Sequence, residues 1–182
     1  MERRRYLALL RGINVGGNNI IKMDALKNLF EEAGFTGAAT YIQSGNVMFT
    51  AAENSKTKIA EKMETALYKK LGNKITAALL TFPELKRIIE KKPKDFGEEA
   101  DTYKYDVIFL IEPLRARDAA GELRTREGVD EKYEGEQVLY IRRLTSSLSK
   151  SYFSKVALSS IYPNITIRNW NTTKKLFEIM DA

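Results

Sequence analysis

A stretch rich in glycine and asparagine, RGINVGGNN, follows a short apolar run near the start of the chain. Glycines let a backbone adopt left-handed conformations and come close to a ligand, and successive free N–H groups can form a concave anion site. The leading arginine adds a fork of donors suited to phosphate or carboxylate. The spacing is neither GxGxxG nor GxxxxGK[ST], so neither standard nucleotide signature applies. A ligand loop and a purely structural turn both remain open, and the candidate ligand residues are Arg11, Asn14, Gly16 and Gly17.

A second polar cluster lies in TYIQSGNVMF, residues 40–49, where Ser-Gly-Asn indicates a turn between two strands. A plain hairpin explains the glycine and asparagine. However, Gln43, Ser44 and Asn46 also place polar side chains at a strand end, and we expect this hairpin to lie near the end of the first strand. These three residues are therefore candidate ligand residues as well.

Two stretches towards the carboxyl end add three further candidates. LTSSLSKSYFSK contains S-x-x-K, but no partner motif of the penicillin-recognising enzymes accompanies it. Lys150 and the serines around it could instead bind an anion at a helix start, or merely cap that helix. In IRNWNTTKKL, Arg168 and Trp170 could form a cationic and stacking wall. Alternatively, Trp170 holds the last helix against the core.

The composition excludes several kinds of chemistry. The 182 residues include no histidine and no cysteine, which removes thiolate and imidazole metal sites and the common nucleophilic triads and dyads. No acidic motif calls for magnesium, so we predict no metal site, and the sequence identifies no cofactor. A formal net charge of +6 favours an anionic partner, although an ordinary solvated basic surface has the same composition.

No apolar run is long enough to span a bilayer, and the first one stops at Arg11, too early for a signal peptide. We therefore expect no membrane partner and a cytoplasmic protein. The sequence leaves the oligomeric state uncertain, either a monomer or a weak dimer.

Hydrophobic periodicity predicts the order β-α-β-β-α-β twice, followed by a terminal helix. This order is the ferredoxin-like unit, so the predicted fold class is α+β. Two ferredoxin-like halves would have mainly antiparallel sheets, with helices packed on them. The expected parts are a first half at 1–82, a helix and polar connection at 83–103, and a second half with the terminal helix at 104–182. The expected strands are 4–11, 38–43, 47–50, 75–82, 106–111, 129–134, 137–144 and 165–168, and the expected helices are 23–33, 55–71, 84–91, 114–120, 149–160 and 172–180. Side by side, the two halves would form one continuous sheet with a cleft.

The sequence also resembles a bacterial family, the domain of unknown function 1697. The matching stretches are YLALLRGINVGGNN, LFEEAGFTGAATYIQSGNVMF, LTSSLSKS and IRNWNTTKKL, which together span nearly the whole chain. The resemblance implies two ferredoxin-like halves and no established activity, so no catalytic residue is carried over. Asn18 stands where histidine is common in the family, which argues against a catalytic role at that position here.

These observations favour a binding domain for a phosphorylated or anionic ligand, either a nucleotide-like small molecule or nucleic acid. One alternative is a transferase or hydrolase whose proton transfers use a shifted lysine, tyrosine or carboxylate. Another is a protein interaction module that uses its sheet edges.

Overall fold

The computed structural model describes residues 3–182, which divide into two compact units. Unit 1 holds the chain up to Glu84 together with Met180–Ala182, and unit 2 is Leu85–Ile179. Each unit contains one four-stranded antiparallel sheet. This confirms the predicted α+β class with helices on antiparallel sheets and a terminal helix. The expectation of one continuous sheet is wrong, because each hydrogen-bonded ladder ends at its own edge strands.

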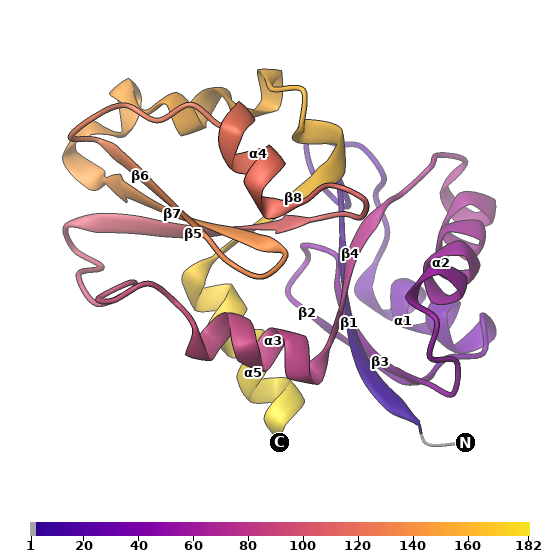
Figure 1. Ribbon diagram of the computed structural model, residues 1–182. Coiled ribbons are helices and arrows are strands. Elements are labelled where there is room, and N and C mark those ends of the chain that lie inside the picture. The colour runs from indigo at the N-terminus through magenta and orange to yellow at the C-terminus, as the bar shows by residue number, and fades with distance from the viewer. Residues whose placement is uncertain (1–2) are drawn as a thin grey trace. The chain divides into compact units, whose positions relative to one another are not determined.

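Unit 1 has the element order and the strand order of the ferredoxin-like unit. Its sheet order is β2-β3-β1-β4, with every neighbouring pair antiparallel. Helices α1 and α2 cover one face of this sheet (Figure 1). The elements are β1 (Arg4–Leu10), α1 (Met23–Glu32), β2 (Thr36–Tyr41), β3 (Asn46–Ala51), α2 (Lys56–Leu71) and β4 (Ala77–Thr81).

The core of unit 1 lies between this sheet face and the two helices. Helix α1 contributes Leu26 and Phe30, and α2 contributes apolar side chains at helical spacing. Phe49 of β3 stacks on Tyr6 of β1, with ring centroids 5.7 Å apart. Because apolar residues recur every three or four positions in both helices, local sequence is sufficient to predict which face they bury.

Unit 2 repeats the strand order as β6-β7-β5-β8, again antiparallel throughout. Helix α4 and the segment between β7 and β8 cover one face of the sheet. The elements from residue 82 onward are α3 (Phe82–Glu90), β5 (Tyr103–Leu110), α4 (Ala116–Glu122), β6 (Asp130–Glu134), β7 (Val138–Leu144), β8 (Ile165–Asn169) and α5 (Trp170–Asp181).

The helix expected at 149–160 does not form. Two 3-10 segments, η1 (Thr145–Lys150) and η2 (Tyr152–Leu158), cover most of that range, and a third, η3 (Tyr162–Asn164), follows it. Ser154 Oγ donates to the carbonyl of Ser151 at 2.6 Å, and Asp130 Oδ2 accepts from the Tyr152 amide at 2.8 Å. Side chains that bond to nearby backbone in this way compete with α-helical hydrogen bonds. The proposed anion site at a helix start near Lys150 therefore loses its helix.

The polar connection at 92–102 contains a core residue. Phe96 is 2% exposed, and its ring makes edge contacts with Tyr105, Tyr140 and Trp170 at centroid distances of 4.8, 5.3 and 5.3 Å. These rings lie on the sheet face of unit 2 opposite α4. A single aromatic in a charged stretch has no periodicity, so the sequence offers no signal for its burial.

Candidate functional site

The loop between β1 and α1 is tied together by the side chain of Asn14. Asn14 Oδ1 accepts from the Ile21 amide at 2.8 Å, and Nδ2 donates to the Ile21 carbonyl at 3.0 Å. The same Nδ2 donates to the carbonyl of Gln43 at 3.3 Å. Asn14 thus closes the loop on itself and joins it to the β2–β3 hairpin, so its amide is largely committed to the fold.

The tip of the loop is a tight turn at Val15–Asn18. The Asn18 amide donates to the Val15 carbonyl at 3.1 Å. Gly16 and Gly17 have φ angles of +59° and +78°, as a type I′ turn requires. Around a Cβ built on Gly17 no other atom lies within 4 Å, so the backbone of the tip is open to a ligand.

Asparagines at the base of the loop hold it to the rest of unit 1. Asn19 Nδ2 donates to the carbonyl of Gly12 at 3.0 Å, and Asn73 Nδ2 donates to Asn19 Oδ1 at 3.1 Å. The amide of Arg11 donates to the Thr76 carbonyl at 2.9 Å. The arginine side chain is half-buried. Much of the glycine and asparagine content therefore serves the loop's own conformation.

The β2–β3 hairpin lies against the end of β1, as its sequence predicts. The Leu10 amide donates to the Gly45 carbonyl at 2.8 Å. Asn46 is fully buried, and its Nδ2 donates to the Tyr41 carbonyl at 2.9 Å. Ser44 is half-buried and Gln43 is exposed. Of the three candidates in this hairpin, Gln43 has the most accessible side chain.

A groove of about 410 Å³ lies between the loop, the hairpin and the start of α1. We call it the loop groove. It brings together three of the candidates predicted from the sequence: Asn14, Gly17 and Gln43. Among the described residues, Arg11, Gly16, Ser44 and Asn46 are not part of its lining. The full lining is Asn14, Gly17, Ile20, Ile21, Lys22, Met23, Asp24 and Gln43.

Sequence inspection missed Lys22 and Asp24, which line the loop groove with opposite charges. Lys22 is the N-cap residue of α1, and no side chain caps that helix end. The first backbone N–H groups of a helix lack partners within the helix and favour negative charge nearby. Asp24 lies in the same first turn. The expected helix start at residue 23 is the one signal next to Lys22 and Asp24. A lysine before a helix is too common to predict a ligand site.

In unit 2, Arg168 is a buried arginine within the sheet. It is 8% exposed, and its Nη1 donates to Thr166 Oγ1 at 2.9 Å and to the Ile167 carbonyl at 2.8 Å. Burial lowers the pKa of its guanidinium to about 10, because the charged form loses hydration. It remains protonated at neutral pH and is bonded to oxygen atoms of its own strand.

Trp170 is 5% exposed and starts α5. Its ring makes an edge contact with Phe96. Gly97 also lies close to the indole, since a Cβ built on Gly97 would be 2.3 Å from Trp170 Nε1. This packing explains Trp170 in structural terms.

Lys150 lies exposed in η1. The function proposed below therefore rests on residues of unit 1 alone.

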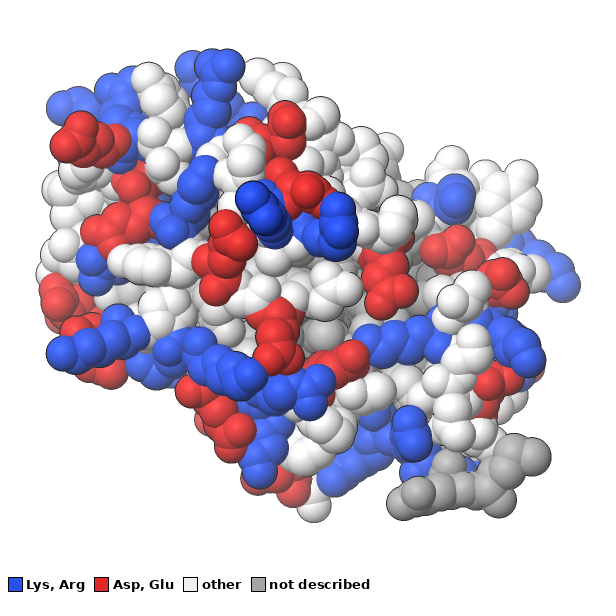
Figure 2. Space-filling view, in the orientation of Figure 1, with Lys and Arg blue, Asp and Glu red and all other residues white. Residues whose placement is uncertain are grey.

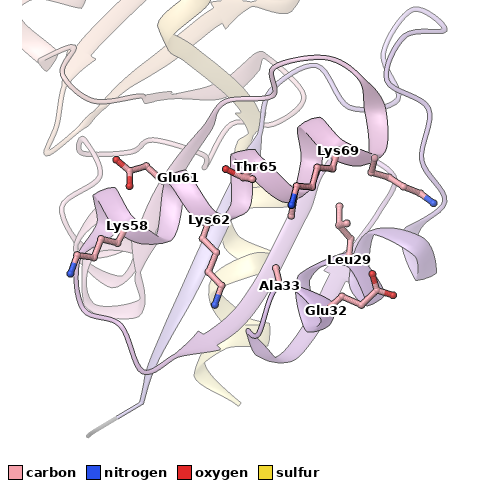
Figure 3. A pocket seen from close by; sticks show the side chains of 10 residues that line it. Leu29, Glu32, Ala33, Lys58, Glu61, Lys62, Thr65 and Lys69 are labelled. Atoms are coloured by element: carbon pink, nitrogen blue, oxygen red, sulfur yellow. The ribbon is translucent and has the colours of Figure 1, made fainter.

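A second, larger groove of about 680 Å³ runs between α1 and α2, and we call it the lysine groove. Four lysines of α2 line it, with Glu32 and Glu61 as the acidic residues. Figure 3 shows Lys62 and Lys69 extending from α2 towards the side where Leu29 of α1 and Ala33, the residue after α1, lie. Lys62 also lies over the ring of Phe35, with Nζ 5.3 Å from the centroid. The lining is Leu29, Glu32, Ala33, Lys58, Glu61, Lys62, Thr65, Ala66, Lys69 and Lys70.

Basic and acidic side chains are otherwise interspersed, as the face drawn in Figure 2 shows. Within residues 3–182, no cluster of three or more acidic side chains has an arrangement that could hold a metal ion. Over the same part of the chain, every helix is too short or too polar to cross a membrane.

Comparison with known proteins identifies relatives but no activity. A solved structure described as conserved bacterial protein SP0830 from Streptococcus pneumoniae is similar, with a TM-score of 0.85 and 28% sequence identity. The similarity covers 98% of this chain and 99% of that one. Curated proteins provide no match. A family model described as a protein of unknown function, DUF1697, matches residues 3–140, about three quarters of the chain, and the chain therefore belongs to the DUF1697 family.

Proposed function

We propose that this protein binds a small phosphorylated or otherwise anionic ligand in the loop groove. The observation that carries the proposal is that Asn14, Gly17 and Gln43, which come from two separate polar motifs, line one groove together with Lys22. The volume of about 410 Å³ is within the usual range for small-molecule sites.

The residues of the loop groove offer three kinds of donor to an anion. Lys22 provides a mobile ammonium group, and the uncapped start of α1 provides backbone N–H groups. The open backbone at Gly17 allows close approach. Asn14 acts differently, because its amide bonds to Ile21 and Gln43 and so fixes the shape of the wall.

Asp24 opposes an anion from the same groove, which makes the charge effect testable in both directions. Replacing Lys22 by alanine is expected to weaken binding of inorganic phosphate about two- to fivefold, and Asp24→Asn is expected to strengthen it by a similar factor. Charges at an exposed helix end typically contribute about 0.3–1 kcal/mol. Titration of the ¹⁵N-labelled protein with phosphate, followed by NMR, measures both affinities and locates the shifted amides.

Lys27→Ala and Glu31→Gln are matched controls, because both residues are exposed on α1 and neither lines the loop groove. Both should leave the affinity at the wild-type value. Shifts that avoid residues 14–24 and 43, or equal effects of the control variants, would contradict the proposal.

A second candidate function, nucleic-acid binding, is favoured by the four lysines of the lysine groove. If single-stranded DNA binds there, log K should fall linearly with log salt. The double variant Lys62→Ala with Lys69→Ala should reduce that slope by about 1.4, since each lost contact with a single strand removes about 0.7. Fluorescence anisotropy with a labelled oligonucleotide measures the slope. Lys174→Ala, an exposed change on α5, is the control, and an equal reduction there would remove the lysine groove from consideration.

A further inference from the structure

Three large apolar side chains of the loop and the hairpin are open to solvent, and each either lines the loop groove or is next in sequence to a residue that does. Val15 is 64% exposed, Ile20 is 72% exposed and Ile42 is 47% exposed. Single exposed apolar residues are ordinary, whereas neighbouring ones rimmed by polar groups mark a binding surface. Elsewhere in the described chain, the exposed large hydrophobics are Tyr68 on α2 and Tyr152 and Leu158 on η2.

A hydrogen bond joins the two segments that carry these residues. Ile20 lines the loop groove itself. Val15 follows Asn14 and Ile42 precedes Gln43, and Asn14 Nδ2 donates to the Gln43 carbonyl at 3.3 Å. The side chain of Asn14 therefore joins the loop to the backbone of the hairpin, and Val15 and Ile42 are the chain neighbours of the two bonded residues.

Ile42 is in an unusual backbone conformation for its type. Its φ angle is +48°, in the left-handed region where β-branched residues are genuine outliers and asparagine is several-fold enriched. A residue chosen for the turn alone would be glycine or asparagine. An isoleucine that is both conformationally unfavourable and half-exposed indicates that its side chain has a use outside the fold.

We propose, building on the function proposed above, that the ligand of the loop groove is an amphiphilic phosphate. Its phosphoryl group lies beside Lys22, and its aliphatic chain lies across Val15, Ile20 and Ile42. Charge complementarity with Lys22 favours the phosphoryl group there, and Ile20, which lines the same groove, favours an aliphatic chain beside it. The volume of about 410 Å³ suits one small molecule rather than a membrane surface, so the ligand is a free amphiphile.

A series of alkyl monophosphates below their micelle concentrations, from methyl to octyl, tests the proposal by calorimetry or NMR titration. Affinity for the wild type is expected to rise about two- to fourfold per added methylene, as expected for partial to full burial of each group. Ile42→Asn and Val15→Ser should flatten this dependence while leaving the affinity for methyl phosphate unchanged, because neither residue lines the loop groove. Ile42→Asn should also keep or raise the melting temperature, because asparagine suits a positive φ, and this excludes misfolding as the cause.

Leu158→Asn removes an exposed apolar side chain from η2 and should leave the chain-length dependence intact. An affinity independent of chain length, or equal flattening by Leu158→Asn, overturns the inference while the proposed anion site stands. Absence of binding by every member, methyl phosphate included, overturns the proposed function as well. Sedimentation with phosphatidic acid vesicles, without binding of free alkyl phosphates, would assign the three side chains to a membrane surface and overturn the inference.

Discussion

Replacing Gly97 by alanine is expected to destabilise the protein by about 3 kcal/mol or more. Gly97 has a φ of +90°, and a Cβ built there would lie 2.3 Å from Trp170 Nε1 and 2.4 Å from Trp170 Cδ1. Strained backbone costs about 1–3 kcal/mol, and overpacking a core adds about 1–3 kcal/mol. The indole cannot move aside easily, because the ring of Phe96 contacts it at a centroid distance of 5.3 Å. Urea denaturation followed by circular dichroism measures the loss.

Gly128→Ala separates the two causes of this loss. Gly128 has a similar φ of +71°, but nothing lies within 4 Å of its built Cβ. This control should cost only about 1–2 kcal/mol, the usual penalty for a left-handed L-residue. Trp170 is the sole tryptophan, so its fluorescence should shift to the red in Gly97→Ala and stay unchanged in Gly128→Ala. Equal destabilisation of the two variants would show that contact with Trp170 is unimportant.

The stability contributed by Tyr140 is expected to disappear at high pH. Burial raises the pKa of Tyr140 to about 12, from an ordinary value of 10.0. The folded state therefore keeps this proton where the unfolded state loses it, and stability falls as pH rises from 10 towards 12. From these two pKa values the loss by pH 12 is about 2 kcal/mol.

Arg168 acts in the opposite direction over the same pH range. Its pKa is lowered to about 10 by burial, so the unfolded state binds its proton more tightly and stability rises with pH above 10. The measurement is therefore the difference in unfolding free energy between the wild type and Tyr140→Phe, in which the contribution of Arg168 cancels.

At pH 8, Tyr140→Phe should be less stable than the wild type by about 1 kcal/mol, because the tyrosine hydroxyl donates to the Ile88 carbonyl at 2.7 Å. By pH 12 the order should reverse. Tyr68→Phe, at an exposed site, serves as the control for high-pH effects on the measurement. A wild-type advantage that stays constant from pH 8 to pH 12 would contradict the burial-based shift.

The sequence by itself determined the order of elements and the type of most of them. A short apolar run and helical spacing reflect the geometry of each element alone. The run RRYLALL, the spacing of Leu26 and Phe30, and the apolar stripe of α2 were therefore sufficient. The absence of histidine and cysteine likewise excluded whole classes of chemistry without reference to any fold. Local side-chain competition with the backbone misled the prediction at 149–160, where serines favour 3-10 turns.

Only the tertiary structure decided which polar residues face a ligand-sized space. Asn14 and Asn46 look alike in sequence, yet one lines the loop groove and the other is fully buried. Arg168 and Trp170 are types often found in ligand sites, and long-range packing in unit 2 buries both. Nothing in the sequence indicates that Lys22 or Ile42 takes part in a site, and the loop and the hairpin are joined by a hydrogen bond between residues 29 positions apart. Sequence patterns report local periodicity, whereas exposure and proximity depend on contacts between distant segments.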